Sequence, residues 1–518
     1  MMVMMDAPGF HKVEVRANDF AVRNSRHPTH IVVQLFGFLM FAATLLGCQQ
    51  PLVVQPLYSA IGETIDAQPE RAALAPATAT AVTVTETWVT LPTYPFERYQ
   101  TDAFDDYYRW PYKRFDVERY RAEAPTPTRR AYRLVVLENE WLRLLLLPEL
   151  GGRLWQVIHK PTGAPMFYQN EYVKPTHWGH PNQLGWLALG GLEWGLPVIE
   201  HGYDWGTPWP YMTERNDAGE AAVVVTTPDD GRLLHARIRV SLRPGEASFF
   251  IEPQLTNRST RTLAYSFWLD AMLAPGSGGR PSAQLQFVLP TARVRLHSTA
   301  EPGLPSPGET FPWPRVGARD LSRLGAWGEY LGFFESPAAH GPFVGVYDPA
   351  FDAGAVRIFP PDVAQGSKVF ALGWRNALAS DNYTADDSVY VELHGGVAPS
   401  FFEQARLTAG DAIAWQEQWY PVHGIGGLVY SNEQAALNLT RTAGGLRVGL
   451  YSPRPLTGLL VVGDGAAELA RVAVQATPNA PFTALVNVGA RPSGPLTLRL
   501  EDADGRTMFT YRNAADEP

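Results

Sequence analysis

Aromatic and ionisable side chains alternate in one short stretch of the chain, residues 178–211. The members that could take part in binding or catalysis are Trp178, Trp186, Glu193, Trp194, Glu200, His201, Tyr203, Asp204, Trp205 and Trp209. Aromatic rings stack on the C–H faces of sugars, and carboxylates and imidazoles bond the hydroxyls at the ring edge. Frequent glycines and prolines around them indicate loops. The stretch therefore predicts a carbohydrate site in which the sugar contacts Trp178, Glu193, Trp194, Tyr203 and Trp205.

The same rings also fit a purely structural role. Tryptophan is highly buried on average, so they are consistent with a plug at one end of a β-sandwich. A plug has no need of many ionisable groups, which are costly to bury, and this favours the carbohydrate site. Glu193 and Glu200 are also consistent with the acid pair of a glycoside hydrolase, whose separation in space the sequence does not give.

Basic side chains before this stretch are further candidates for the site. Arg153 follows two glycines after an apolar strand, where its guanidinium could bind a pair of sugar hydroxyls or a uronate; a clamp onto a neighbouring carboxylate such as Glu149 is the alternative. Lys174, His177 and His180 are expected at the rim. The two histidines lack a third ligand with recognisable spacing, so we expect no metal.

Bulk composition limits the classes of function. The 518 residues are 45% hydrophobic and 18% charged, with a formal net charge of −9, which argues against binding to nucleic acid or to a membrane through a polybasic surface. Phosphate-binding glycine loops, dinucleotide fingerprints, serine elbows and zinc spacings are absent from the sequence. We therefore expect a globular protein without a cofactor, whose partner is a mono-, oligo- or polysaccharide.

The elements that must position these residues read as strands. Many segments alternate apolar and polar residues, as 237–242 does, and long amphipathic helical patterns are scarce. The 46 glycines and 44 prolines suit an all-β protein with many turns. We expect a large antiparallel β-sandwich. Its strands are predicted at 132–138, 141–148, 233–242, 247–255, 263–272, 283–289, 292–297, 343–347, 355–359, 369–374, 389–394 and 412–420.

The N-terminus resembles a bacterial export signal. An apolar run at 31–47 follows Arg16, Arg23 and Arg26, and it ends at Cys48, the one cysteine of the chain. The tetrapeptide 45–48 resembles a lipobox, which predicts lipidation of Cys48. An uncleaved transmembrane anchor is the alternative, although the run is short for one. Either way we expect a membrane-anchored protein outside the cytoplasm, at the cell surface or in the periplasm.

Four segments follow from these patterns. A lipoprotein signal segment is expected at 1–48 and a flexible tether, rich in alanine, threonine and proline, at 49–86. The large sandwich is expected at 87–425. Short strands between close turns predict a small immunoglobulin-like sandwich at 426–518, in which no catalytic constellation is evident.

Motifs along 87–422, about two thirds of the chain, resemble those of a known family. The more specific are Pro-Glu-Leu-Gly-Gly-Arg at 148–153 and Glu-His-Gly-Tyr at 200–203. Others lie at 137–142, 147–155, 160–163, 167–170, 173–175, 191–194, 390–396, 407–411 and 415–421. The chain resembles an uncharacterised bacterial domain-of-unknown-function family of the galactose-mutarotase-like (aldose 1-epimerase-like) superfamily. That resemblance implies a β-supersandwich whose concave sheet face receives a sugar.

The resemblance also implies acid–base chemistry at the anomeric centre. A late-strand glutamate acts as base in the superfamily, which points to Glu392; period-two alternation places Tyr390, Glu392 and His394 on one face. The alternative for Glu392 is an ion pair across the sheet. Where the superfamily has its proton-donating histidine, this chain has Asp270 or Trp268. His201, oriented by Glu200 or Glu193, is the candidate acid, and a structural histidine is the alternative.

We therefore expect a surface-anchored carbohydrate-binding protein with a mutarotase-like domain, acting on the anomeric centre or the glycosidic bond of a sugar. Catalysis is assigned to Glu392, His201 and Glu200, and sugar contacts extend to Arg153, Lys174, Asp270 and His394. Two alternatives remain, a non-catalytic glycan-binding module and a structural envelope lipoprotein. The missing histidine favours the first of these.

Overall fold

The computed structural model describes residues 81–374, 384, 386, 388–465, 467–488 and 495–513. All of them belong to one compact unit, Ala67–Pro518. The expected signal segment, Cys48 and residues 49–80 of the expected tether lie outside the described residues. Within the described part, no helix is long and apolar enough to span a bilayer.

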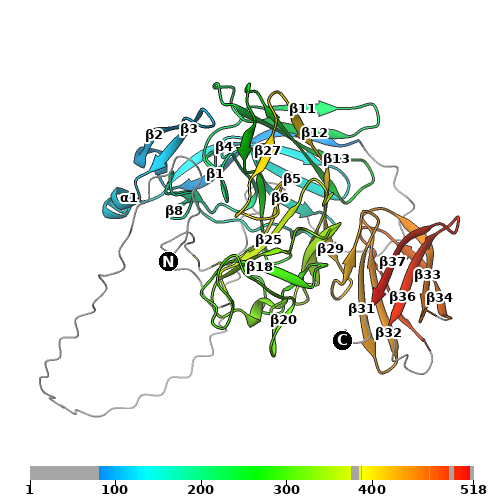
Figure 1. The fold of residues 1–518 in the computed structure, drawn as a ribbon. Helices are drawn as coiled ribbons and strands as arrows, with labels where there is room; N and C mark the ends of the chain where they lie inside the picture. The colour runs from blue at the N-terminus through cyan, green and yellow to red at the C-terminus, as the bar shows by residue number, and fades with distance from the viewer. Residues whose placement is uncertain are drawn as a thin grey trace, which may run out of the picture. The chain divides into compact units, whose positions relative to one another are not determined.

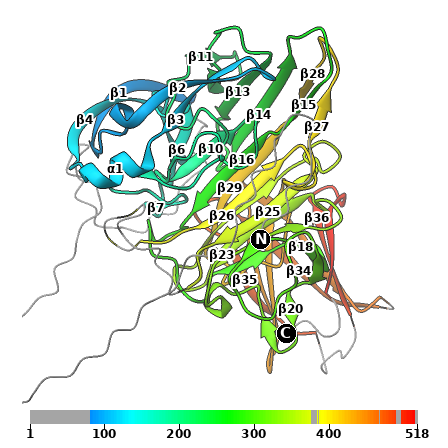
Figure 2. The ribbon, with the colours of Figure 1, turned by 60° about the vertical axis from the view of Figure 1, so that its left-hand side comes forward.

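A 12-stranded antiparallel sheet forms the first layer of the fold (Figure 1). Its strands, in spatial order, are β1 (Thr83–Thr93), β4 (Thr128–Glu138), β5 (Leu142–Leu147), β6 (Arg153–His159), β10 (Gly191–Gly195), β16 (Trp268–Leu273), β26 (Val391–Gly396), β25 (Gly366–Ala371), β22 (Leu331–Glu335), β18 (Arg293–Thr299) and β19 (Thr310–Pro312), with β7 (Ala164–Pro165) beside β6. Figure 2 shows β6, β10, β16, β26 and β25 following one another across the molecule.

A nine-stranded antiparallel sheet forms the second layer. In spatial order it contains β11 (Tyr211–Arg215), β12 (Ala221–Thr226), β13 (Leu234–Leu242), β14 (Phe249–Asn257), β29 (Glu417–His423), β24 (Ala353–Ile358), β23 (Phe343–Asp348) and β17 (Gln286–Val288), with β28 (Ala412–Ala414) beside β14. The alternation expected at 237–242 is present in β13, where Ile238 and Val240 are fully buried and Arg237 and Arg239 are partly exposed. One face of this strand therefore packs and the other meets solvent.

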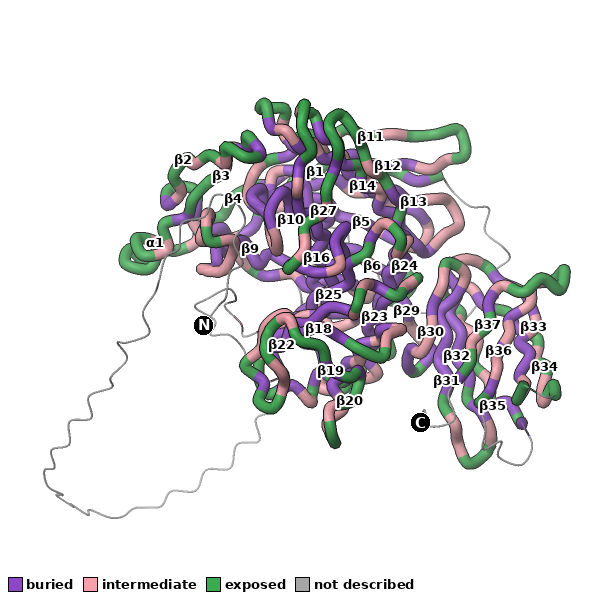
Figure 3. Tube along the Cα trace, in the orientation of Figure 1, coloured by how far each residue is buried: buried purple, intermediate pink, exposed green. Residues whose placement is uncertain are grey.

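The core lies between the two sheets. Leu192, Leu269 and Leu393 of the 12-stranded sheet share one hydrophobic cluster with Ile238 and Ile251 of the nine-stranded sheet. Figure 3 shows the buried residues gathered along strands such as β10, β16 and β25. Side chains alternate between the two faces of a strand, so the residues next to these leucines along each strand project from the opposite face of the large sheet. We call this face, which is turned away from the nine-stranded sheet, the outer face.

Short elements lie between the strands of the two sheets along the chain. Helix α1 (Val117–Glu123) begins after Asp116, whose side chain accepts a hydrogen bond from the backbone N–H of Arg119 as an N-cap does. The remaining short elements are η2 (Phe96–Tyr99), β2 (Gln100–Asp105), β3 (Trp110–Phe115), β8 (Pro175–Thr176), β9 (Trp186–Leu187), β15 (Leu263–Tyr265), β20 (Arg315–Val316), β21 (Arg319–Asp320), η3 (Leu324–Ala326) and β27 (Ala405–Leu407).

The C-terminal part forms a smaller sandwich with a core of its own. One four-stranded sheet contains β30 (Tyr430–Ser431), β31 (Ala436–Thr442), β32 (Gly445–Tyr451) and β35 (Phe482–Val486), and the other contains β34 (Glu468–Ala476), β33 (Leu456–Gly463), β36 (Leu496–Asp502) and β37 (Thr507–Asn513). The expected all-β class, a large sandwich followed by a small one, is confirmed. The boundary expected after residue 425 stays a prediction, since both sandwiches belong to one compact unit.

Candidate functional site

Four polar side chains form a row across the middle of the large sheet, on its outer face. The strand register pairs Glu193 of β10 with Asp270 of β16, Asp270 with His394 of β26, and His394 with Lys368 of β25. Directly paired residues of antiparallel strands project to the same face. We call Glu193, Asp270, His394 and Lys368 the charged row. Glu392 lies on the same face, two residues before His394.

His394 is the centre of this row. Its Nε2 atom lies 2.8 Å from Oε2 of Glu392, 3.1 Å from Nζ of Lys368 and 3.3 Å from Oδ1 of Asp270. A ring nitrogen carries either one proton or one lone pair, so it can satisfy only one of these neighbours fully. Within the described part of the chain, neither oxygen of Asp270 receives a hydrogen bond. The row therefore keeps hydrogen-bonding capacity that the surrounding protein does not use.

His201 lies beside the row and is held in one orientation. Its Nδ1 atom lies 2.7 Å from Oε1 of Glu193, and its ring stacks on Trp186 with centroids 3.7 Å apart. The indole N–H of Trp186 donates to the same glutamate oxygen at 2.8 Å. A carboxylate on one ring nitrogen leaves the other, Nε2, for proton exchange. Of the two carboxylates expected to orient His201, Glu193 does so, whereas Glu200 lies 3.6 Å from Nε2 of His297.

Exposure decides which end of the row a ligand can reach. The side chains of His394 and Asp270 are 0% and 1% exposed, whereas those of Glu392, His201 and Glu200 are 5%, 11% and 32% exposed. The row and Glu392 are therefore buried in the middle of the sheet, and His201 beside the row is more exposed than any of them. A ligand of the row therefore meets His201 before the buried side chains.

Burial shifts the pKa values of the row in a consistent direction. It raises the pKa of Asp270 well above its usual value, and the negative charges of Glu392 and Glu193 add to the effect. Burial also raises the pKa of Glu392, while the positive charge of Lys368 opposes the rise. The pKa of His394 falls well below its usual value, mainly through burial. A carboxylate with a raised pKa is better matched to proton transfer near neutral pH than an ordinary one.

Two triads have the spacing of metal ligands. One consists of Glu193, His201 and Asp270, the other of Asp270, Glu392 and His394, and in each the ligand atoms lie within 4.8 Å of one another. Lys368 argues against an ion in the second triad, because its ammonium already lies 3.1 Å from Nε2 of His394 and would repel a second cation. In the first triad, an ion would have to displace the hydrogen bond between His201 and Glu193.

Three of the aromatic side chains expected to contact the sugar are buried in the structure. Trp194, Trp205 and Tyr203 are only 3%, 3% and 1% exposed, so none offers a ring face to a sugar. The indole N–H of Trp194 donates to the carbonyl of Gly152, and Tyr203 stacks on Tyr112 with centroids 4.4 Å apart. These rings fill the interior, as the structural alternative for them required. Trp178 is half-buried against a hydrophobic cluster that includes Trp186, Trp205 and Met272, which we call the outer-face cluster.

Arg153 does not face a ligand either. It is fully buried and forms an ion pair of 2.9 Å with Glu193, and it also donates to the carbonyls of Leu150 and Gly190. The alternative of a carboxylate clamp thus describes its role, with Glu193 in place of Glu149 as the partner. Lys174 is likewise buried, with Nζ 3.5 Å from the carbonyl oxygen of Thr384.

Two residues that the sequence analysis did not single out belong to this region. Lys368 takes part in the row, and Phe370 follows it on the same face, directly paired with Glu392. The strand predicted at 369–374 overlaps β25 and begins one residue after Lys368. The local pattern could not show that this strand lies beside β26, because that pairing joins segments about 25 residues apart.

Several comparisons relate the chain to known proteins. The model of a family described as a domain of unknown function (DUF5107) matches residues 106–422, and that of the second domain of YphG-like proteins matches 431–511. Among solved structures, a TPR-domain containing protein from Parabacteroides distasonis matches with a TM-score of 0.55 and 20% identity over 67% of this chain. The match spans 56% of that protein, less than two thirds of its length, and shows a shared fold.

Weaker structural matches include proteins described as mutarotase-like. A galactose mutarotase-like protein from Clostridium acetobutylicum matches with a TM-score of 0.39 and 11% identity, over 57% of this chain and 96% of that one. A galactose mutarotase related enzyme from Lactobacillus acidophilus matches with a TM-score of 0.38 and 10% identity, over 56% and 97%. The family match, by contrast, covers more than half of the chain, and the expected domain-of-unknown-function family is confirmed: the chain belongs to the DUF5107 family.

Proposed function

We propose that the chain binds a saccharide beside the charged row, on the side of His201, and that Glu392 and His201 act there on the anomeric centre or the glycosidic bond. One observation carries this proposal. The two side chains proposed to exchange protons are each held by a buried partner, Glu392 by His394 at 2.8 Å and His201 by Glu193 at 2.7 Å. Fixed acid–base pairs of this kind are typical of active sites.

The chemistry that these two groups support is proton exchange on opposite sides of a sugar ring. Glu392, as carboxylate, takes the proton of the anomeric hydroxyl, and His201 donates a proton from Nε2 to the ring oxygen, which opens the ring. Closure on the other face returns both protons and inverts the anomer. For a glycoside, donation to the glycosidic oxygen instead releases the leaving group, while the carboxylate activates water. Lys368 stabilises the ionised form of Glu392 in both cases, since its charge lowers the pKa of that glutamate.

A binding function without turnover is the second candidate. The missing histidine of the superfamily, with Asp270 or Trp268 at its place, favours it, whereas the burial of Trp194 and Trp205 leaves fewer ring faces for binding. Phe370 and Trp178, both only partly buried against the outer-face cluster, remain as apolar contacts for a sugar face. The two candidates share one ligand class and differ in whether Glu392 is needed for turnover.

A glycan array followed by titration and turnover assays separates these candidates. Glu392→Gln keeps the shape of the side chain and removes its charge. If the protein is an enzyme, this variant should keep its affinity for the saccharide and lose turnover. The exposed Glu118 of α1 provides the matched control, Glu118→Gln, which should change neither. If the wild type binds saccharides and turns over none of them, the catalytic function is excluded and the binding function is supported. No binding across the array would refute both.

Export and lipid anchoring are part of the same proposal. The apolar run at 31–47 and Cys48 at the end of the lipobox-like tetrapeptide support them. A saccharide-binding domain at the surface would then be held near its polymeric ligand. Metabolic labelling with an alkyne fatty acid should tag the wild-type chain and not Cys48→Ala. Equal labelling of both would contradict lipidation at this residue.

A further inference from the structure

A polar cavity of about 470 Å³ lies where the small sandwich meets the large one, away from the charged row. Its floor is a row on the outer face of the nine-stranded sheet. Phe250 of β14 and Ile358 of β24 are the direct strand partners of Gln418 of β29, one on each side. The volume is within the range of small-molecule binding sites.

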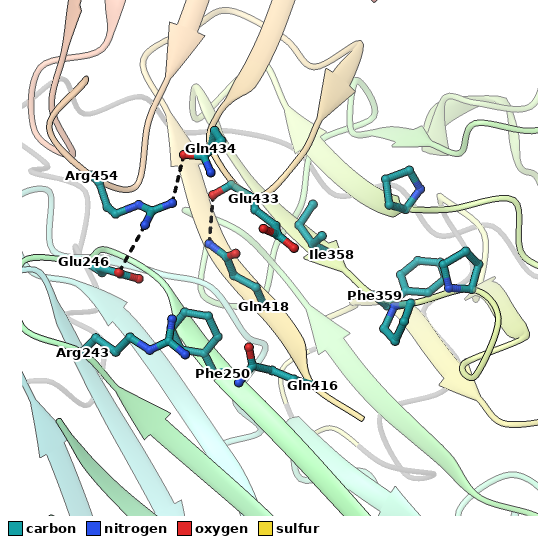
Figure 4. Close-up of a pocket in the computed structure, with 13 residues that line it drawn as sticks. Arg243, Glu246, Phe250, Ile358, Phe359, Gln416, Gln418, Glu433, Gln434 and Arg454 are labelled. Carbon is teal, nitrogen blue, oxygen red and sulfur yellow. Dashed lines mark hydrogen bonds and ion pairs between the residues drawn. The ribbon is translucent and has the colours of Figure 1, made fainter. Parts of the chain in front are cut away.

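Both sandwiches contribute walls to this cavity. Arg243 and Glu246 come from the turn after β13, and Glu433, Gln434 and Arg454 come from the small sandwich (Figure 4). Nearby, Tyr420 and Val422 of β29 pack with Leu428 and Tyr451 in one hydrophobic cluster, which fixes the two sandwiches against each other at this place. The cavity is therefore incomplete without the C-terminal part of the chain.

The polar groups of the wall are only partly satisfied by one another. Arg454 donates to Oε1 of Gln434 at 3.0 Å and lies 3.6 Å from Glu246, and Nε2 of Gln418 donates to the carbonyl of Glu433 at 3.3 Å. In the described structure, the other half of each of these two amides has no protein partner. The guanidinium of Arg243 comes no closer to a carboxylate than 3.9 Å, at Glu220.

This inventory specifies the chemistry of a ligand. Two arginines and two glutamates among the lining residues balance in charge, so a strongly anionic or cationic ligand gains little. The unused groups include donors, Nε2 of Gln434 and the Arg243 guanidinium, and an acceptor, Oε1 of Gln418. Hydroxyls both donate and accept, and thus match a mixed set. The guanidinium of Arg243 lies 3.7 Å over the ring of Phe250, where its flat outer face can contact the C–H face of a sugar.

We infer that this cavity is a second saccharide site, one for a neutral oligosaccharide, assembled from both sandwiches. It gives the C-terminal sandwich a role in ligand binding that goes beyond the function proposed for the charged row. Two sites on one chain would raise the apparent affinity for a polymer that reaches both.

Side-chain amide signals provide a local test. The full chain is labelled with ¹⁵N-glutamine, and the signals of Gln416, Gln418 and Gln434 are assigned from their loss in single glutamine-to-leucine variants. The probes are cellohexaose, xylohexaose, maltohexaose and mannohexaose, each at up to about 10 mM, which detects dissociation constants near 1 mM. At least one neutral hexasaccharide should shift the Gln418 and Gln434 signals. Hexagalacturonate is the acidic comparison.

Matched variants locate the binding. Arg454→Met and Gln418→Leu should each raise the dissociation constant about tenfold or more, because each removes a hydrogen-bonding group. Arg506→Met, in the exposed turn before β37, should not. Glu392→Gln should leave the glutamine shifts unchanged. Saccharide binding in this cavity and saccharide binding at the charged row are therefore tested separately. No shift with any neutral probe, a shift only with hexagalacturonate, or loss of the shifts in Glu392→Gln would each overturn the inference.

Discussion

Removing either partner of the buried pair Arg153–Glu193 should destabilise the fold strongly, and removing both should restore part of the loss. The guanidinium is 0% exposed and the carboxylate 4% exposed, with 2.9 Å between them. Breaking such a pair leaves an uncompensated buried charge, which costs about 3–5 kcal/mol, whereas replacing both partners by apolar or neutral groups is often close to neutral. We therefore expect Arg153→Met and Glu193→Gln each to lower the free energy of unfolding by about 3–5 kcal/mol.

A double-mutant cycle measures the coupling between these two side chains. Free energies of unfolding from guanidinium chloride titrations of the wild type, both single variants and the double variant should give a favourable coupling of about 2 kcal/mol or more, within the range for residues in contact. Additive losses would refute the ion pair as the main role of Arg153. So would a variant Arg153→Met that keeps its stability and loses glycan affinity, because Arg153 would then contact the sugar.

Three further predictions concern other buried groups. Arg357→Met should cost about 3–5 kcal/mol of unfolding free energy, since both oxygens of Glu417 lie 2.7 Å from the lost guanidinium; denaturant titration against Arg506→Met as control measures this. Burial lowers the pKa of His159 to about 3, below the value of about 6.5 in the unfolded chain, so stability should fall as pH drops below 6.5, by up to about 2 kcal/mol at pH 5. Calorimetry should find a shallower pH dependence in His159→Gln, and equal slopes would contradict the prediction. Lys368→Met should move the acid limb of turnover to higher pH, because the Lys368 charge lowers the pKa of Glu392; an unmoved limb would exclude that coupling.

Local patterns predicted the strands and their faces well. Alternation placed Glu392 and His394 on one face, and the structure has them there, 2.8 Å apart. The pairing of β26 with β16 joins segments more than 100 residues apart in sequence, and nothing in either segment alone encodes it. The sequence therefore showed that Asp270 departs from the superfamily pattern, but it did not predict that Asp270 lies beside His394.

Burial was harder to predict than strand position. The glycine- and proline-rich frame around Trp194 and Trp205 indicated loops, and loops usually lie on the surface. Trp194 instead lies on strand β10. The loop after this strand packs inward, and its polar groups find buried partners, as Asp204 does in Arg232 at 2.6 Å. Two ionisable groups of the stretch, Glu193 and Asp204, thus belong to internal ion pairs, and His201 combines partial exposure with a contact to the charged row.

The most direct test of the proposed site is a crystal structure of the chain with a saccharide identified by the array. We expect a sugar ring on the outer face of the 12-stranded sheet, with its anomeric oxygen within hydrogen-bonding distance of Glu392 and a ring or glycosidic oxygen near Nε2 of His201. A well-ordered saccharide that contacts neither residue, with the face at β16, β25 and β26 unoccupied, would contradict it.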